Sequence, residues 1–117
     1  MAQIEIQSLK TSTRVQPVGG EQAVVAAGRA AVFDAEAPVP PIIVPPVDPG
    51  GSGPFLFAPS DLGTRPTTEL AAGTERRQGL MVLGVRDTDV IYLEKLQPLA
   101  QLAGREGRRL LVRIGDG

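Results

Sequence analysis

The hydrophobic and polar residues near the start of the chain alternate with the period of a β-strand. Over residues 3–9, Ile4 and Ile6 alternate with glutamine and glutamate, as expected for a strand with one buried face. We therefore predict a strand here. Because a terminal strand is well placed at the edge of a sheet, where it can pair with a neighbouring chain, Ile4 and Ile6 are candidate partner contacts.

Residues 23–33 (AVVAAGRAAVF) form a second apolar run whose type is ambiguous. Five alanines suit a helix, whereas Gly28 in the middle and the flanking valines suit two strands around a bend. We favour the strands and leave the helix open. The spacing of Gly19, Gly20 and Gly28 matches no phosphate-binding pattern, so no nucleotide loop is predicted.

The last third of the chain holds three further apolar runs. Residues 79–85 and 90–93 are separated by a turn-like stretch and predict a hairpin, whose continuous apolar character places it at the centre of a sheet. Residues 108–114 alternate again, which predicts a strand with one apolar face and a basic outer face.

Two segments have helical character. Residues 67–73 predict one or two turns, with Thr67 or Thr68 as the cap and Gly73 as the stop. Between residues 93 and 104 leucine and alanine recur at helical spacing, with Gly104 as a C-terminal stop. Proline is tolerated only in the first turn, so Pro98 predicts that this helix begins near Gln97 or is kinked there.

A proline-rich stretch divides the chain. Eight of the eleven prolines lie between Pro38 and Pro59. Proline fixes φ and has no amide donor, so this stretch is expected to be neither a helix nor a central strand. We predict a single domain over residues 1–117, of the β-rich α+β class. It has a small antiparallel or mixed sheet, one short helix near residues 97–103, and an extended Pro/Gly-rich loop or arm over residues 37–59.

The stretch is unusually apolar for a linker. Burying one aliphatic side chain contributes about 1.5–3 kcal/mol, so leaving several in water forgoes much of a small domain's stability. They are expected to pack either on their own domain or on another subunit, and the sequence favours neither. The apolar candidates for a partner contact in and after this stretch are Val39, Ile42, Ile43, Val44, Val47, Phe55 and Phe57.

The amino-acid composition excludes most of the common kinds of catalytic site. The chain has no His, Cys or Trp, which excludes Ser–His and Cys–His pairs, disulfides and His/Cys metal sites. Asp87 and Asp89 lack the further ligands of a calcium loop and are better explained as turn residues. We therefore expect no enzymatic activity, no cofactor, no metal and no small-molecule substrate.

Charge is nearly balanced overall, at −1, but unevenly distributed. Residues 1–75 carry a net charge of −4 and residues 76–117 carry +3. Such a polarity favours the association of copies in a defined orientation. Charges scattered over a solvated surface explain the difference equally well. The C-terminal arginines are not interleaved with aromatic residues, so nucleic-acid binding is not expected. Arg109 and Arg113 are instead candidates for ion pairs between subunits.

The start of the chain lacks the basic and apolar regions of a signal peptide, and residues 37–47 are too short to cross a bilayer. We expect a soluble protein that is made in the cytoplasm and has no membrane partner.

These expectations lead to a functional hypothesis: a non-enzymatic structural subunit of a larger homomeric assembly. The composition resembles that of small virion components of tailed bacteriophages, such as capsid decoration or head–tail joining proteins, which implies incorporation into a virion. The alternative is a monomeric regulatory or peptide-binding module that recognises one partner protein through the extended loop.

Overall fold

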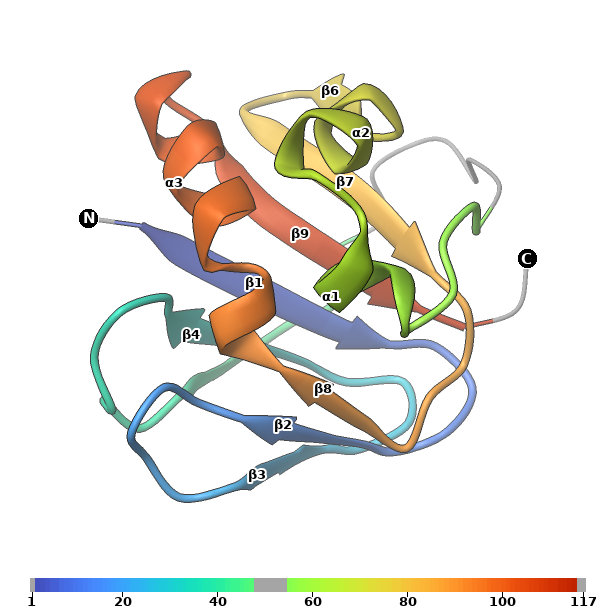
Figure 1. The fold of residues 1–117 in the computed structure, drawn as a ribbon. Coiled ribbons are helices and arrows are strands. Elements are labelled where there is room, and N and C mark those ends of the chain that lie inside the picture. Colours follow the sequence, from blue (N-terminus) through green and yellow to red (C-terminus); the bar gives the residue numbers. More distant parts are fainter. Residues whose placement is uncertain (1, 48–54, 116–117) are drawn as a thin grey trace.

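The computed structural model describes residues 2–47 and 55–115, and these form two mixed β-sheets with helices on one side (Figure 1). The six-stranded sheet has the order β5 (Ile42–Val44), β4 (Ala30–Asp34), β1 (Gln3–Ser8), β9 (Arg109–Ile114), β7 (Leu80–Val85) and β6 (Glu75–Arg77). The three-stranded sheet has the order β3 (Ala23–Val25), β2 (Thr13–Gln16) and β8 (Val90–Tyr92). The predicted β-rich α+β class is confirmed.

Strand β1 lies at the centre of the larger sheet, so its predicted edge position is wrong. It pairs antiparallel with β4 and parallel with β9, and both faces are covered. Ile4 and Ile6 are fully buried in the core, and Glu5 and Gln7 on the opposite face are buried as well. The alternating pattern predicted the strand correctly, but polar residues on its second face do not lie in solvent.

The main core fills the space between one face of the larger sheet, the smaller sheet and the helices (Figure 1). Strands β1 and β9 contribute Ile4, Ile6, Leu110 and Val112, while Val15 of β2 closes the core from the smaller sheet. The helices that cover it are α1 (Asp61–Thr64), α2 (Thr67–Ala72) and α3 (Gln97–Arg105), the last preceded by the short helix η1 (Leu93–Lys95).

The predicted hairpin over residues 79–93 is wrong. Strands β7 and β8 lie in different sheets, and β7 pairs with β9 and β6. The hairpin is instead β6–β7, turning at Gln78 and Gly79, which both have positive φ, as a two-residue turn between right-twisted strands requires. Strand β7 buries alternate residues, with Met81, Leu83 and Val85 in the core, and it lies next to the edge strand β6 and not at the centre of the sheet.

The helix predictions are largely confirmed. Helix α3 begins at Gln97 with Pro98 in its first turn, but it continues through Arg105 and does not stop at Gly104. Helix α2 spans two turns before Gly73, and its cap is Pro66 in place of the expected threonines.

The ambiguous run over residues 23–33 forms two strands around a bend, as favoured. Strand β3 joins the smaller sheet, strand β4 joins the larger one, and Gly28 between them has φ +77°. A positive φ costs glycine little, which lets the chain pass from one sheet to the other.

Candidate functional site

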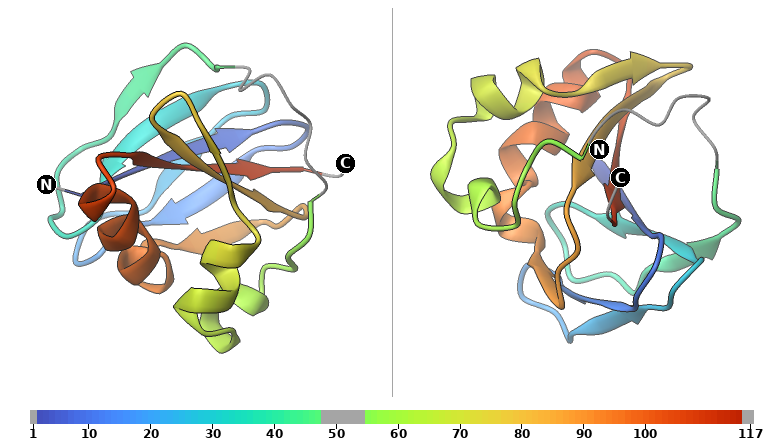
Figure 2. Two further views of the ribbon diagram at one scale, coloured as in Figure 1. Left: turned by 90° about the horizontal axis from the view of Figure 1, so that it is seen from above. Right: turned by 90° about the vertical axis from the view of Figure 1, so that its right-hand side faces the viewer.

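The proline-rich segment, defined here as residues 37–47, follows the outer edge of the larger sheet through β5 (Figure 2). Ile42 and Ile43 are 66% and 65% exposed, and Val39 and Val47 are exposed as well, whereas Val44 is half-buried. Backbone pairing therefore holds the segment on its own domain without burying most of its aliphatic side chains. The part of the predicted loop over residues 48–54 lies outside the described residues.

The start of the segment is anchored by Asp34 at the end of β4. Its Oδ1 accepts hydrogen bonds from the N–H groups of Glu36 at 2.8 Å and Ala37 at 3.0 Å. An aspartate that binds the main chain two and three residues later forms a tight turn. Asp34 was not singled out from the sequence, although an aspartate four residues before the first proline of the stretch is compatible with a turn there.

The end of the segment is anchored by Gln7 of the central strand β1. Its side-chain amide donates from Nε2 to the carbonyl of Val47 at 2.8 Å, and its Oε1 accepts a hydrogen bond from Nε of Arg113 at 3.0 Å. Gln7 is buried, whereas Val47 is exposed, so the bond joins the interior of the sheet to a surface segment. Sequence reasoning missed this contact because no local pattern links residues 40 positions apart.

A groove of about 370 Å³ separates the segment from the β2–β3 connection. It is lined mainly by Pro17, Gly20 and the prolines and valine of residues 38–41. An added Cβ at Gly20 would lie 3.1 Å from Cβ of Pro38 and 3.4 Å from Cβ of Pro17. Glycine at this position therefore lets the two chain segments approach closely.

The remaining candidate contacts from the sequence do not belong to this surface. Ile4 and Ile6 are in the core and cannot be reached by a partner. Phe57 is buried too, forms an isolated bridge with Val85, and holds its ring against Gly73. Phe55 is half-buried.

The two arginines proposed for contacts between subunits are engaged within the chain. Arg109 Nη2 lies 2.8 Å from Oε1 of Glu5, whose side chain is only 1% exposed, and Arg113 binds Gln7. Burial raises the pKa of Glu5, and the Arg109 charge opposes that shift. These contacts join the acidic first part of the chain to the basic last part.

The opposite charges of the two chain halves therefore do not form two ends of the molecule. Strand β1 lies between β4 and β9, which interleaves the halves within one sheet. In the last part of the chain Glu106 forms ion pairs with two arginines. Its Oε1 lies 2.7 Å from Nε of Arg76 and 3.5 Å from Nε of Arg108. The hydrogen bond from Arg76 lowers the pKa of Glu106.

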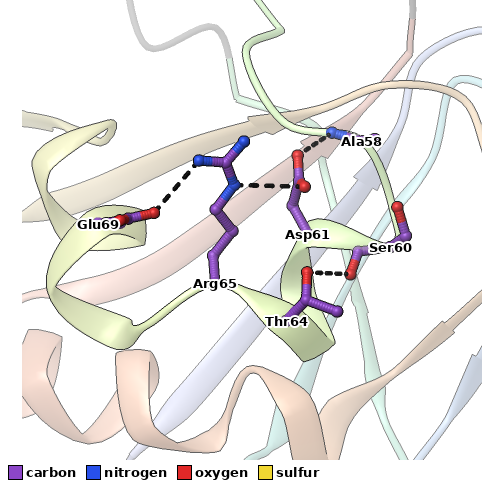
Figure 3. Close-up of polar contacts among 6 residues, drawn as sticks. All are labelled: Ala58, Ser60, Asp61, Thr64, Arg65 and Glu69. Carbon is purple, nitrogen blue, oxygen red and sulfur yellow. Dashed lines mark hydrogen bonds and ion pairs between the residues drawn. The ribbon is translucent and has the colours of Figure 1, made fainter.

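A second polar network holds α1 against α2 (Figure 3). The N–H of Ala58 donates to Asp61 Oδ2 at 2.9 Å, which lowers the pKa of Asp61. Arg65 bridges Oδ1 of Asp61 at 3.4 Å and Oε2 of Glu69 at 3.2 Å. This arrangement is explained by a hydrogen bond that closes the turn before α1 and by ion pairs at a spacing of four residues.

A smaller hollow of about 250 Å³ lies beside this network, lined in part by Ser60, Thr88, Tyr92 and Lys95. The Lys95 ammonium is 5.6 Å from the centre of the Tyr92 ring, so it is engaged in a cation–π contact. Apart from this lysine, no lining residue is a base that could activate the hydroxyl groups of Ser60, Thr88 or Tyr92 as nucleophiles.

Within residues 2–47 and 55–115, no three acidic side chains lie close enough together to hold a metal ion. No helix in these ranges has the length and apolarity needed to cross a bilayer. Comparison of the chain with protein-family models, with curated proteins and with solved structures found no match.

Proposed function

We propose that the protein is a non-enzymatic structural subunit of a larger homomeric assembly, and that it associates through the proline-rich segment. The observation that carries the proposal is the exposure of Ile42 and Ile43 on a segment that is anchored at both ends. A surface held in place by Asp34 and Gln7 loses little conformational freedom when a partner covers it, which favours binding.

The energetics support burial of this surface in an assembly. Removing one aliphatic side chain from water contributes about 1.5–3 kcal/mol, and four exposed aliphatic residues of the segment lie close together in the chain, namely Val39, Ile42, Ile43 and Val47. Residues 37–47 carry no charge, so burying them costs no desolvation of ions.

Sedimentation velocity or light scattering over a range of protein concentrations tests the proposal. We expect the wild type to form a concentration-dependent oligomer and Ile42→Asp to shift it toward the monomer. Val24→Asp is the matched control, because Val24, like Ile42, is an exposed β-branched residue on a short edge strand, but in the smaller sheet. A wild type that is monomeric at every concentration, or equal loss of association in both variants, would contradict the proposal.

A bacteriophage particle is the class of assembly that the composition suggests, and virion incorporation forms part of the proposal. It is supported by the lack of histidine and cysteine together with an apolar, uncharged surface suited to joining repeated copies. Capsid or tail genes beside the coding sequence would support this assignment, whereas neighbouring genes of an unrelated metabolic operon would count against it.

The groove beside the segment favours a second candidate function: a monomeric module that recognises one partner protein. Its lining combines Pro17 and residues 38–41 with Glu21 and Gln22, which suits a mainly apolar peptide. Affinity purification that recovers one defined partner, combined with a monomeric mass for the isolated protein, would favour this function over the assembly.

A further inference from the structure

The main-chain hydrogen bonds of β4 determine which way the backbone of β5 faces. N–H and C=O groups of successive residues in a strand point to opposite sides. The N–H of Ser8 donates to the carbonyl of Arg29, and the N–H of Ala35 donates to the carbonyl of Ala2, each at 3.1 Å. The register of β1 and β4 is constant. The main-chain groups of the odd-numbered residues of β4 therefore point toward β1, and those of the even-numbered residues point toward β5.

The register of β4 and β5 shows which main-chain groups of the edge strand β5 point toward β4. Val32 is opposite Ile42, and Ala30 is opposite Val44, so the main-chain groups of Ile42 and Val44 are directed toward β4. Those of Ile43 point away from the sheet, toward the side where β5 has no strand neighbour among the described residues.

Prolines isolate this outward N–H group. The main-chain groups of residues 41 and 45 point away from the sheet like those of Ile43. Both residues are prolines, however, and have no N–H to donate. Between Pro41 and Pro45 the free edge of β5 therefore presents one donor, on Ile43, together with the carbonyl of the same residue.

We propose that β5 pairs with β5 of a second copy, antiparallel and about a two-fold axis, so that Ile43 of each copy both donates to and accepts from Ile43 of the other. This contact rests on the proposed homomeric assembly and specifies one of its interfaces. A two-fold axis requires a self-complementary surface, which a donor and an acceptor on one residue provide.

The side chains of β5 favour the same partner. Ile42 and Val44 lie on one face of the strand and Ile43 lies on the other, so a second β5 covers apolar surface on both faces with β-branched residues opposite one another. No charge on residues 37–47 opposes the approach of an identical copy. The other edge of the sheet, β6, consists of Glu75, Arg76 and Arg77, a charged sequence typical of edges that avoid pairing.

The prolines also limit the pairing. A ladder between two copies ends at Pro41 and Pro45, because neither can donate to a neighbouring strand. The contact between two copies is therefore restricted to two hydrogen bonds. It closes after two copies because both copies use the same edge, and the charged strand β6 at the other edge of the sheet disfavours continued edge-to-edge growth.

Amide hydrogen exchange measured by NMR at low and high protein concentration tests the strand pairing directly. We expect the amides of Ile42 and Val44 to be protected at both concentrations and the amide of Ile43 to become protected only at the higher one. An Ile43 amide that exchanges freely in the associated protein would overturn the pairing. Protection that appears only after a protein of different sequence is added would overturn it as well.

A pair of variants isolates the hydrogen bond from the side chain. Ile43→Pro and Ile43→Ala both remove the isoleucine, but only Ile43→Pro removes the outward N–H, which β4 does not use. We expect Ile43→Pro to weaken self-association at least about tenfold more than Ile43→Ala, as two lost hydrogen bonds require. Equal association of the two variants would overturn the pairing, and if Ile43→Pro fails to fold, the exchange of the wild-type Ile43 amide decides.

The outcomes separate this inference from the proposed function. A wild type that remains monomeric at all concentrations contradicts the homomeric assembly and the β5 pairing together. A wild type that associates and is disrupted by Ile42→Asp, but leaves the Ile43 amide unprotected, supports the assembly and rules out the pairing.

Discussion

Gln7, in the central strand of the larger sheet, donates a hydrogen bond from its side chain to the main-chain carbonyl of Val47, 40 residues later, at 2.8 Å. The same side chain accepts a hydrogen bond from Arg113. One buried glutamine thus connects β1, β9 and the end of the proline-rich segment.

Replacing Gln7 with alanine is expected to loosen the segment and lower stability. Loss of the amide leaves the carbonyl of Val47 and the Nε of Arg113 without this partner, which costs about 1–3 kcal/mol. Urea denaturation measures the loss, and hydrogen exchange should show faster exchange of the amides in β5. Gln3→Ala is the control, because Gln3 is exposed on the same strand, and equal effects of the two substitutions would contradict the anchoring role.

The buried Glu5 makes stability depend on pH in a defined direction. Burial raises its pKa above the ordinary value of 4.5, more than Arg109 lowers it. The folded state therefore holds the proton to higher pH than the unfolded state, so the contribution of Glu5 is most favourable below pH 4.5 and is lost as the pH rises through the raised pKa.

Glu5→Gln removes this titration, and unfolding of both proteins at several pH values measures it. We expect the stability of the wild type relative to Glu5→Gln to fall as the pH rises above 4.5. Other carboxyl groups, such as Asp61 with its lowered pKa, are present in both proteins and cancel in the difference. A difference that instead grows in favour of the wild type with rising pH would show that Arg109 outweighs burial.

Two glycines are expected to respond oppositely to the same change. A Cβ at Gly73 would overlap the ring of Phe57, whereas a Cβ at Gly104 in helix α3 meets nothing within 4 Å. Gly73→Ala should therefore destabilise the fold by about 1–3 kcal/mol, while Gly104→Ala should stabilise it by about 0.5–1 kcal/mol. Thermal or urea denaturation of both variants checks the signs, and destabilisation by both would show that the helix end of α3 is constrained.

Self-association through residues 37–47 should depend little on ionic strength. Interactions between exposed charges weaken as salt rises, but this segment has no charge. Sedimentation at low and high sodium chloride should give similar association constants, and ammonium sulfate should strengthen association, since it favours apolar burial. A steep loss of association with sodium chloride would point to ion pairs between copies in place of the apolar edge.

The sequence by itself determined the local elements. The alternation of Ile4 and Ile6 predicted β1, Pro98 correctly placed the start of α3 near Gln97, and Gly28 marked the bend between two strands. These features are local because backbone preference and the period of apolar residues act within a few residues of one another.

Only the tertiary structure decided how these elements pair and which apolar residues remain outside. Strand β1 is central and not an edge, β7 and β8 lie in different sheets, and Ile42 and Ile43 are exposed although they are as apolar as the buried Ile4. Pairing depends on which strands compete for the same neighbour, and that competition involves residues far apart in the chain. A central strand and an edge strand can have the same apolar residues, and only the position of the neighbouring strands distinguishes them.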